Sequence, residues 1–131
     1  MTRAAVLIHK NDEYLLVQER AAPVHGKWNW VQGLCEGGEL SEDAAVREAK
    51  EEIGFDVDLG GLITIIRNPF PDTKELRVYA ATVRGGELSF PKNEIMDARW
   101  HTLEGIEAIQ DQLVGEWVLE TIRLQASLGS A

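Results

Sequence analysis

Three glutamates close together in the sequence have the residue type and spacing of a metal-binding site. Glu48, Glu51 and Glu52 fall in a segment whose pattern predicts a helix from Glu42 to Ile53. At about 100° per residue, the three side chains share one face of that helix. Hard oxygen ligands that converge from one face suit Mg²⁺ or Mn²⁺. A solvated acidic face is the alternative interpretation, and the helical spacing alone fits both.

The ends of the predicted helix bear on this choice. Ser41 is a good N-cap residue, and Gly54 suits the left-handed position that follows a helix. Glu51 and Glu52 then lie at the negative end of the helix dipole, where each contact between like charges costs about 0.2–0.5 kcal/mol. A cation is expected to offset this cost. The glycines before the helix let the backbone approach a phosphate or a metal closely.

The segment from Gly33 to Phe55, GLCEGGELSEDAAVREAKEEIGF, resembles the signature box of the Nudix hydrolases. Gly33 is followed after five residues by Glu39, and Glu39 after seven residues by the run REAKEEIGF, which begins at Arg47. All seven fixed positions of the box match, although Ala49 is smaller than the aliphatic residue usual there. The resemblance implies an α/β fold of the Nudix type, which is an α/β/α sandwich with a mixed β-sheet.

The resemblance also implies a role for each charged residue of the box. By the family pattern, Glu48, Glu51 and Glu52 ligate a divalent metal, and either Glu48 or Glu51 serves as the general base. Arg47 lies four residues before Glu51, so the two side chains can pair along the helix and the arginine can hold that carboxylate in place. Glu39, in the preceding loop, is a second expected partner of Arg47.

Two residues outside the helix complete the implied metal site. The family offers a backbone carbonyl from the residue before the box glycine, which is Gln32 here. Val31-Gln32-Gly33 stands where Pro-Gly-Gly is usual, and the effect of that replacement on the loop is left open, although any residue supplies a carbonyl. Glu94, which precedes Trp100, resembles the late acidic residue of the family. A solvated loop charge is the alternative interpretation of Glu94.

The expected substrate contacts are Arg20, Lys27 and Trp28. Arg20 and the Gly26-Lys27-Trp28 segment resemble the family's approach to the box, and the two positive charges suit phosphate groups. Ordinary surface charges are the alternative. Trp28 and Trp30 lie two residues apart and share a face of a predicted strand. Core packing is the default interpretation of that face, and stacking of Trp28 on a nucleobase is the alternative.

The rest of the chain is expected to form the scaffold. Strand patterns cover residues 3–9, 14–20, 28–31, 55–58, 62–67, 76–83, 88–90 and 98–101. Gly60-Gly61 is expected to break the strand region after the box helix, and residues 68–74 are expected to form a loop. Helices are expected over residues 102–109 and 111–125, the second with an apolar side that packs on the sheet.

Length, charge and cysteine content limit the possible classes. The 131 residues are expected to form one domain over residues 1–131. The net charge of −9 and the scattered basic residues argue against long nucleic acid as a partner, whereas a small phosphorylated ligand can arrive with its own metal. No membrane span and no secretion signal are predicted. The lone Cys35 cannot form an internal disulfide, so a cytoplasmic location is expected. The oligomeric state is left open, a homodimer included.

The sequence as a whole predicts a Mg²⁺-dependent hydrolase, with Mn²⁺ as the other candidate ion. It would cut the diphosphate linkage of a nucleoside diphosphate joined to another group, as in a nucleoside triphosphate or ADP-ribose. One alternative is a non-catalytic Nudix-like domain that senses a nucleotide, against which the intact box argues. Another is an acidic Ca²⁺-binding protein, but the chain lacks the Asp-x-Asp-x-Asp-Gly loop spacing of such sites.

Overall fold

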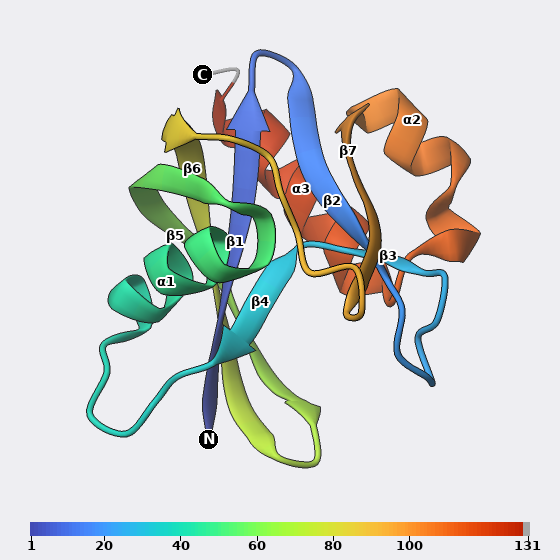
Figure 1. The fold of residues 1–131 in the computed structure, drawn as a ribbon. Helices are drawn as coiled ribbons and strands as arrows, with labels where there is room; N and C mark the ends of the chain where they lie inside the picture. Colours follow the sequence, from blue (N-terminus) through green and yellow to red (C-terminus); the bar gives the residue numbers. More distant parts are fainter. Residues whose placement is uncertain (130–131) are drawn as a thin grey trace.

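The computed structural model describes residues 1–129 and consists of a mixed β-sheet between helices (Figure 1). The helices are α1 (Ser41–Ile53), α2 (Leu103–Ala108) and α3 (Glu116–Gly129), with a 3₁₀ turn at Gln110–Gln112. The strands are β1 (Thr2–Lys10), β2 (Glu13–Glu19), β3 (Trp28–Asn29), β4 (Val31–Leu34), β5 (Phe55–Phe70), β6 (Thr73–Gly86) and β7 (Ile95–Thr102). No helix of residues 1–129 is long and apolar enough to cross a membrane.

Strand β1 is at the centre of the sheet. Its residues from Thr2 to Ile8 pair in parallel with β6, and Arg3 to Val6 pair antiparallel with β4 on the other edge. The end of β1 forms a hairpin with β2, and β2 in turn pairs with β3 and β7. Strand β4, which carries the box glycine, is therefore held directly against the central strand.

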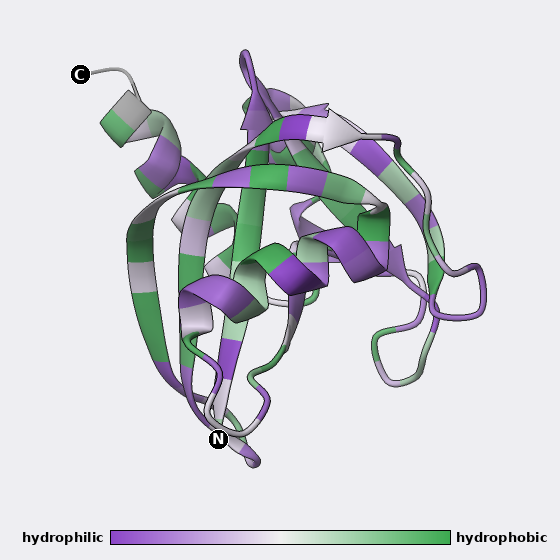
Figure 2. Ribbon diagram, turned by 60° about the vertical axis from the view of Figure 1, so that its left-hand side comes forward, coloured by the Kyte–Doolittle hydropathy of each residue, from purple (hydrophilic) through white to green (hydrophobic). Residues whose placement is uncertain are grey.

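Alternate residues of β1 face opposite sides of the sheet, as the period of a strand requires. Ala4, Val6 and Ile8 belong to the core under α1, whereas Ala5 and Leu7 belong to the core under α2 and α3. In Figure 2 the strands behind α1 carry long hydrophobic stretches, whereas α1 alternates between hydrophobic and hydrophilic residues along its length. The observed layers confirm the predicted α/β/α sandwich with a mixed sheet.

The strands after α1 are longer than predicted. Gly60-Gly61 does not break the chain into two strands, because the register shift between Leu59 and Leu62 absorbs it as an irregularity within β5. The predicted loop over residues 68–74 is wrong as well, since β5 continues to Phe70 and β6 begins at Thr73. The predicted strand over residues 88–90 does not form.

The last helix begins later than predicted, at Glu116 instead of residue 111. Leu113 forms an isolated bridge with Trp28, and the N–H of Val114 donates a hydrogen bond of 3.0 Å to the Trp28 carbonyl. Contact with β3 thus holds Leu113 in an extended conformation and keeps residues 113 and 114 out of the helix in spite of their helical periodicity. Trp117 consequently lies at the start of α3.

The two ends of α1 differ in how well the sequence predicts them. Ser41 is the first helical residue and not the N-cap, which is Leu40 without a side-chain hydrogen bond. The Ser41 hydroxyl lies instead 2.6 Å from the Tyr79 hydroxyl of β6. At the other end, Gly54 is left-handed with φ of 81°, and its N–H donates to the Lys50 carbonyl at 3.1 Å. The predicted role of Gly54 is confirmed.

Gly54→Val is expected to lower the free energy of unfolding by more than about 1 kcal/mol. A β-branched residue resists positive φ, and a Cβ added to Gly54 would lie 2.4 Å from the Glu87 carbonyl oxygen. Gly61→Val is the matched control, since a Cβ there meets nothing within 4 Å. Urea denaturation followed by circular dichroism measures both variants. Equal midpoints for Gly54→Val and wild type would contradict this account of the helix end.

Candidate active site

The three glutamates of the box are presented by one stretch of α1 at different depths. Glu48 is buried, Glu51 is exposed, and Glu52 is intermediate. Gly33 of β4 lies directly against Glu48: a Cβ at Gly33 would approach the Glu48 carboxyl carbon to 2.2 Å. Only glycine leaves room for the carboxyl group in this position. The spacing between the box glycine and the helix thus reflects a contact between β4 and α1.

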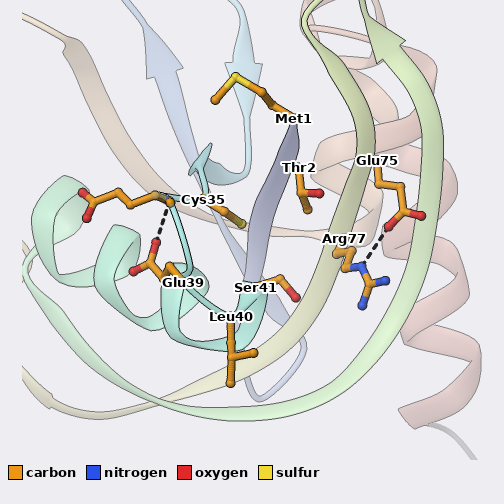
Figure 3. Close-up of a pocket in the computed structure, with 10 residues that line it drawn as sticks. Met1, Thr2, Cys35, Glu39, Leu40, Ser41, Glu75 and Arg77 are labelled. Atoms are coloured by element: carbon orange, nitrogen blue, oxygen red, sulfur yellow. Dashed lines mark hydrogen bonds and ion pairs between the residues drawn. The ribbon is translucent and has the colours of Figure 1, made fainter.

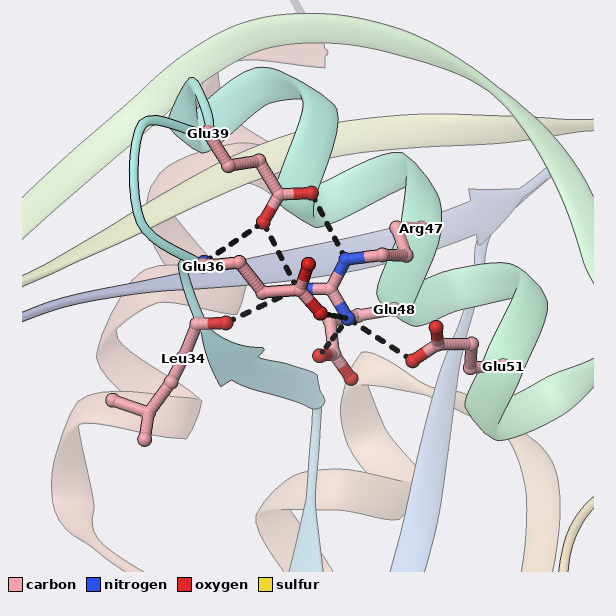
Figure 4. A network of polar contacts seen from close by, with 6 residues as sticks. All are labelled: Leu34, Glu36, Glu39, Arg47, Glu48 and Glu51. Atoms are coloured by element: carbon pink, nitrogen blue, oxygen red, sulfur yellow. Dashed lines mark hydrogen bonds and ion pairs between the residues drawn. The ribbon is translucent and has the colours of Figure 1, made fainter.

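Arg47 is the centre of a polar network that joins the helix to the loop before it (Figure 4). Its Nε donates to Glu39 Oε2 at 2.9 Å, and its Nη2 donates to the Leu34 carbonyl at 3.1 Å. Its Nη1 donates both to Glu48 Oε1 at 2.9 Å and to Glu51 Oε2 at 3.0 Å. The predicted pairings with Glu39 and Glu51 are confirmed, and the contact with Glu48 is an addition.

These contacts also set the charge states around Arg47. Hydrogen bonding to the Arg47 guanidinium lowers the pKa of the Glu39 carboxyl. Burial raises the pKa of Glu48, and the neighbouring Arg47 acts in the opposite direction. Arg47 therefore offsets part of the repulsion that the sequence predicts among the box glutamates.

Glu52 lies outside the Arg47 network and is the most perturbed acid of the site. Burial, followed by the negative charges of Glu48, Glu19 and Glu94, raises the pKa of Glu52 to about 8, against the effect of a backbone hydrogen bond from Gln32. Glu94 is thus close enough to act on Glu52 although it lies in an exposed part of the chain far along the sequence. Gln32 is the residue before the box glycine that the sequence singled out.

These side chains fit a hard divalent cation in their chemistry. Glu48 and Glu51 each give one oxygen to Arg47 and keep the other outside these bonds, and a carboxylate can accept on both oxygens. A cation would also relieve the like charges that raise the pKa of Glu52. However, the side chains of residues 1–129, as they stand, do not bring three His, Cys, Asp or Glu groups together around one metal-sized point. Glu48 and Glu51 are instead turned toward Arg47, which is a physical reason why the three glutamates do not already surround one point.

A cavity of about 450 Å³ lies beside Glu52. Its wall includes Glu52, Gln32, Glu19, Asn29, Phe70 and Trp117. A second hollow, of about 400 Å³, lies near Glu39, Ser41 and Arg77 (Figure 3). Its described wall does not include Glu48, Glu51 or Glu52. The cavity beside Glu52 is therefore the one that a ligand bound at the box glutamates would enter.

The predicted substrate residues divide into two groups. Arg20 is exposed at the end of β2, where its Nε donates to the Lys92 carbonyl at 2.6 Å and its N–H donates to the Glu94 carbonyl at 3.1 Å. Lys27 is partly exposed in the loop that follows. Trp28, in contrast, is only 8% exposed and packs edge to face on His101 in the core, so the packing interpretation holds for it.

Sequence reasoning missed Glu19, Asn29 and Trp117 as residues of the site. The period of β2 carried a signal for Glu19, since Leu15 and Val17 face the core under α1 and Glu19 follows at the same spacing. Asn29 lies between two buried tryptophans and so faces the opposite way. Trp117 was predicted only as part of the packing side of its helix, and no local pattern distinguishes it from the other apolar residues there.

In metal-free buffer, the free energy of unfolding is expected to fall as the pH rises from about 4.5 to about 8. Folding raises the pKa of Glu52, so the folded state holds this proton more tightly than the unfolded chain does. The resulting stabilisation is complete below the pKa of Glu52 in the unfolded chain and is lost as the pH rises through its pKa in the folded state. Glu52→Gln should reduce this slope, to which one group contributes up to about 1.4 kcal/mol per pH unit.

Urea denaturation at a series of pH values measures this effect. Asp43→Asn is the control, because Asp43 is exposed in the first turn of the same helix, and it should keep the wild-type slope between these pH values. If the free energy of unfolding of Glu52→Gln depends on pH as that of the wild type does, the pH dependence does not come from Glu52.

Comparison with known proteins agrees with this geometry. The family model for the NUDIX domain matches residues 1–120. The NAD-capped RNA hydrolase NudC of Stutzerimonas stutzeri is 33% identical over 117 residues, which cover 88% of this chain and 41% of the relative. The chain thus spans about two fifths of the length of this curated relative.

Solved structures share the fold. An Ap4A hydrolase of C. elegans superposes with a TM-score of 0.80 at 20% identity, over 98% of each chain. A NUDIX hydrolase of Nitrosomonas europaea superposes with a TM-score of 0.76 at 25% identity, over 96% of this chain and 88% of the other. Because the family model matches residues 1–120, the chain belongs to the Nudix hydrolase family.

Proposed function

We propose that the protein is a Mg²⁺-dependent pyrophosphohydrolase that cleaves the diphosphate linkage of a nucleoside diphosphate joined to another group. Enzymes of the family generally depend on a divalent metal and act on small nucleotide substrates. The observation that carries the proposal is the set Glu48, Glu51 and Glu52 on one stretch of α1, of which Glu52 lines a cavity that can receive the substrate. Mn²⁺ is the other candidate ion.

The metal is proposed to be held by Glu48, Glu51 and Glu52, with the Gln32 carbonyl and Glu94 completing its surroundings. A divalent ion held there would stabilise negative charge on the phosphoryl oxygens and lower the pKa of bound water. The donors of this set are all oxygens, as Mg²⁺ prefers.

The protein's own side chains position the reacting groups. Arg47 Nη1 bonds both Glu48 and Glu51, so it fixes the directions of two carboxylates at once. Either of these two can take the proton of the attacking water, and Glu48, buried and oriented by Arg47, is the more restrained. Arg20 and Lys27 are proposed to contact the phosphates. Their positive charges oppose the repulsion between an acidic site and an anionic substrate.

The substrate proposed is a phosphoanhydride attached to a nucleoside, such as a nucleoside triphosphate or ADP-ribose. One curated relative is named for NAD-capped RNA and one structural neighbour for Ap4A, and both names support a substrate of this broad kind. Because the chain spans 41% of NudC, the proposal rests on the site within this domain and not on the whole of the relative.

Glu51→Gln and Glu52→Gln should each lower kcat by about a hundredfold or more, since each removes a charged ligand of the metal. The assay is release of phosphate-ended products from a panel of nucleoside triphosphates, ADP-ribose and dinucleoside polyphosphates, with and without MgCl₂. Asp43→Asn is the control on the same helix, because Asp43 is exposed in its first turn. Rates that survive metal chelation, or near-normal rates in both glutamine variants, would overturn the proposed function. Nucleotide binding without turnover would favour a sensing domain instead.

Gly33→Ala should lower kcat by about tenfold or more with little loss of stability. The added Cβ would meet the Glu48 carboxyl at 2.2 Å, and a flexible side-chain end can move aside at small cost to the fold but loses its position in the site. Gly37→Ala, in the loop that follows β4, is the control, since a Cβ there meets nothing within 4 Å. Equal kcat for the two alanine variants would show that the position of Glu48 is not critical.

A further inference from the structure

The turn between β5 and β6 forms one wall of the cavity beside Glu52. Phe70, the last residue of β5, and Asp72 line the cavity, whereas Thr73, the first residue of β6, is 2% exposed and lies outside the described wall. In Figure 1 this turn lies next to the start of β1. A molecule in the cavity therefore meets the hairpin tip, residues 70–73, through Phe70 and Asp72 and not through Thr73.

Backbone pairing with the central strand stops before the hairpin tip. The ladder between β6 and β1 ends at the pair of Glu75 with Thr2, and one more hydrogen bond of 2.8 Å joins the Lys74 N–H to the Met1 carbonyl. Beyond this point β5 and β6 continue as a two-stranded ribbon, which is marginally stable without support from other elements. Side chains therefore have to hold the hairpin tip against the body of the domain.

Arg3 of β1 contacts three residues of the hairpin tip. Its Nε donates to Thr73 Oγ1 at 3.0 Å, its Nη2 pairs with Asp72 Oδ2 at 3.4 Å, and its guanidinium lies 5.4 Å from the centroid of the Phe70 ring. The Thr73 hydroxyl in turn donates to Asp72 Oδ1 at 2.8 Å. A planar guanidinium can donate in its plane and stack its face on an aromatic ring at the same time. One side chain thus fixes the tip to the central strand.

The hairpin tip also packs on α3. Phe70 and Trp117 lie edge to face, with ring centroids 6.2 Å apart and planes at 81°. Trp117 lines the same cavity. A shift of the tip would therefore move Phe70 away from Trp117 and alter the wall on both sides of this contact.

We propose that Arg3 is a positioning residue that holds the hairpin tip in place and thereby sets the affinity for the substrate. The inference rests on the proposed function, because a substrate at the box glutamates reaches the cavity that Glu52 lines. Arg3 acts through Thr73, Asp72 and Phe70 and touches none of the reacting groups. Its loss should therefore weaken binding of the substrate and of the transition state equally, which raises KM and leaves kcat unchanged.

Amide hydrogen exchange in the ligand-free protein tests whether Arg3 holds the hairpin tip. Arg3→Met keeps much of the side-chain length without the donors, and it should speed exchange over residues 70–74 by about tenfold or more, since the tip then opens locally. Arg84→Met is the control at the other end of β6, because the Arg84 side chain is 64% exposed and pairs with Asp58. It should leave exchange at the tip unchanged. Wild-type exchange at the tip in Arg3→Met would overturn the inference.

Kinetics separate this positioning role from direct contact with the substrate, since Arg3 itself also lines the cavity. Thr73→Val removes the acceptor of Arg3 at a residue outside the cavity wall. Arg3→Met and Thr73→Val should each raise KM by about fivefold or more, with kcat within about twofold of wild type, for whichever nucleoside triphosphate, ADP-ribose or dinucleoside polyphosphate the wild type hydrolyses fastest. Arg84→Met should keep both constants.

The double variant completes this test. Because both substitutions break the same hydrogen bond, its KM should equal that of Arg3→Met within about twofold. A wild-type KM in Thr73→Val, or effects that multiply in the double variant, would mean that Arg3 binds the substrate directly and would overturn the inference. If Arg3→Met does not fold, hydrogen exchange and KM of Thr73→Val decide the proposal.

Hydrogen exchange also separates this inference from the proposed function, because it needs neither metal nor substrate. Faster exchange at the tip of Arg3→Met, in a protein that hydrolyses no member of the panel, would refute the proposed function and support the role of Arg3 in holding the tip. Hydrolysis by the wild type together with a wild-type KM in Arg3→Met would refute the inference and keep the proposed function.

Discussion

The hydrogen bonds of Arg47 are the interactions on which the geometry of the box depends. One guanidinium bonds the loop through Glu39, strand β4 through the Leu34 carbonyl, and the helix through Glu48 and Glu51. Lysine could not replace it, because an ammonium group lacks the planar fork that reaches several acceptors in fixed directions. The spacing of the box residues therefore follows from Arg47, which must reach all of these acceptors at once.

The helix can approach the sheet closely because its inner face is small. Ala44, Ala45 and Ala49 are fully buried, and Gly33 of β4, which has no side chain, lies against Glu48 of the same helix. Ala49, the departure from the usual aliphatic residue, thus fits a tightly packed face of α1. The same closeness buries Glu48 and excludes water from part of the acidic face, which raises the pKa of Glu48 and Glu52.

Local chemistry explains which features the sequence predicts. The left-handed Gly54, the shared face of the glutamates and the Arg47 pairings all involve residues within a few turns of one another, so spacing alone specifies them. The start of α3 and the role of Trp28 are different. Both depend on the contact between residues 113–114 and β3, which periodicity cannot reveal. The cavity likewise joins Asn29, Phe70 and Trp117 from three separate parts of the chain. The box is therefore predictable from the sequence, whereas the surroundings that select a substrate are not.

Strand β5 lies at one end of the strand order, with β6 on one side only. A regular edge of this length would offer a row of free backbone groups to any extended chain, which is a route to aggregation. Its pairing with β6 is interrupted by register shifts between Asp56 and Val57, Leu59 and Leu62, Leu62 and Thr64, and Arg67 and Phe70. Such irregularities bend and twist a strand. Gly60-Gly61, which interrupts the strand pattern in the sequence, lies at one of these four shifts, and together the shifts make the outer edge of β5 a poor template for intermolecular sheet growth.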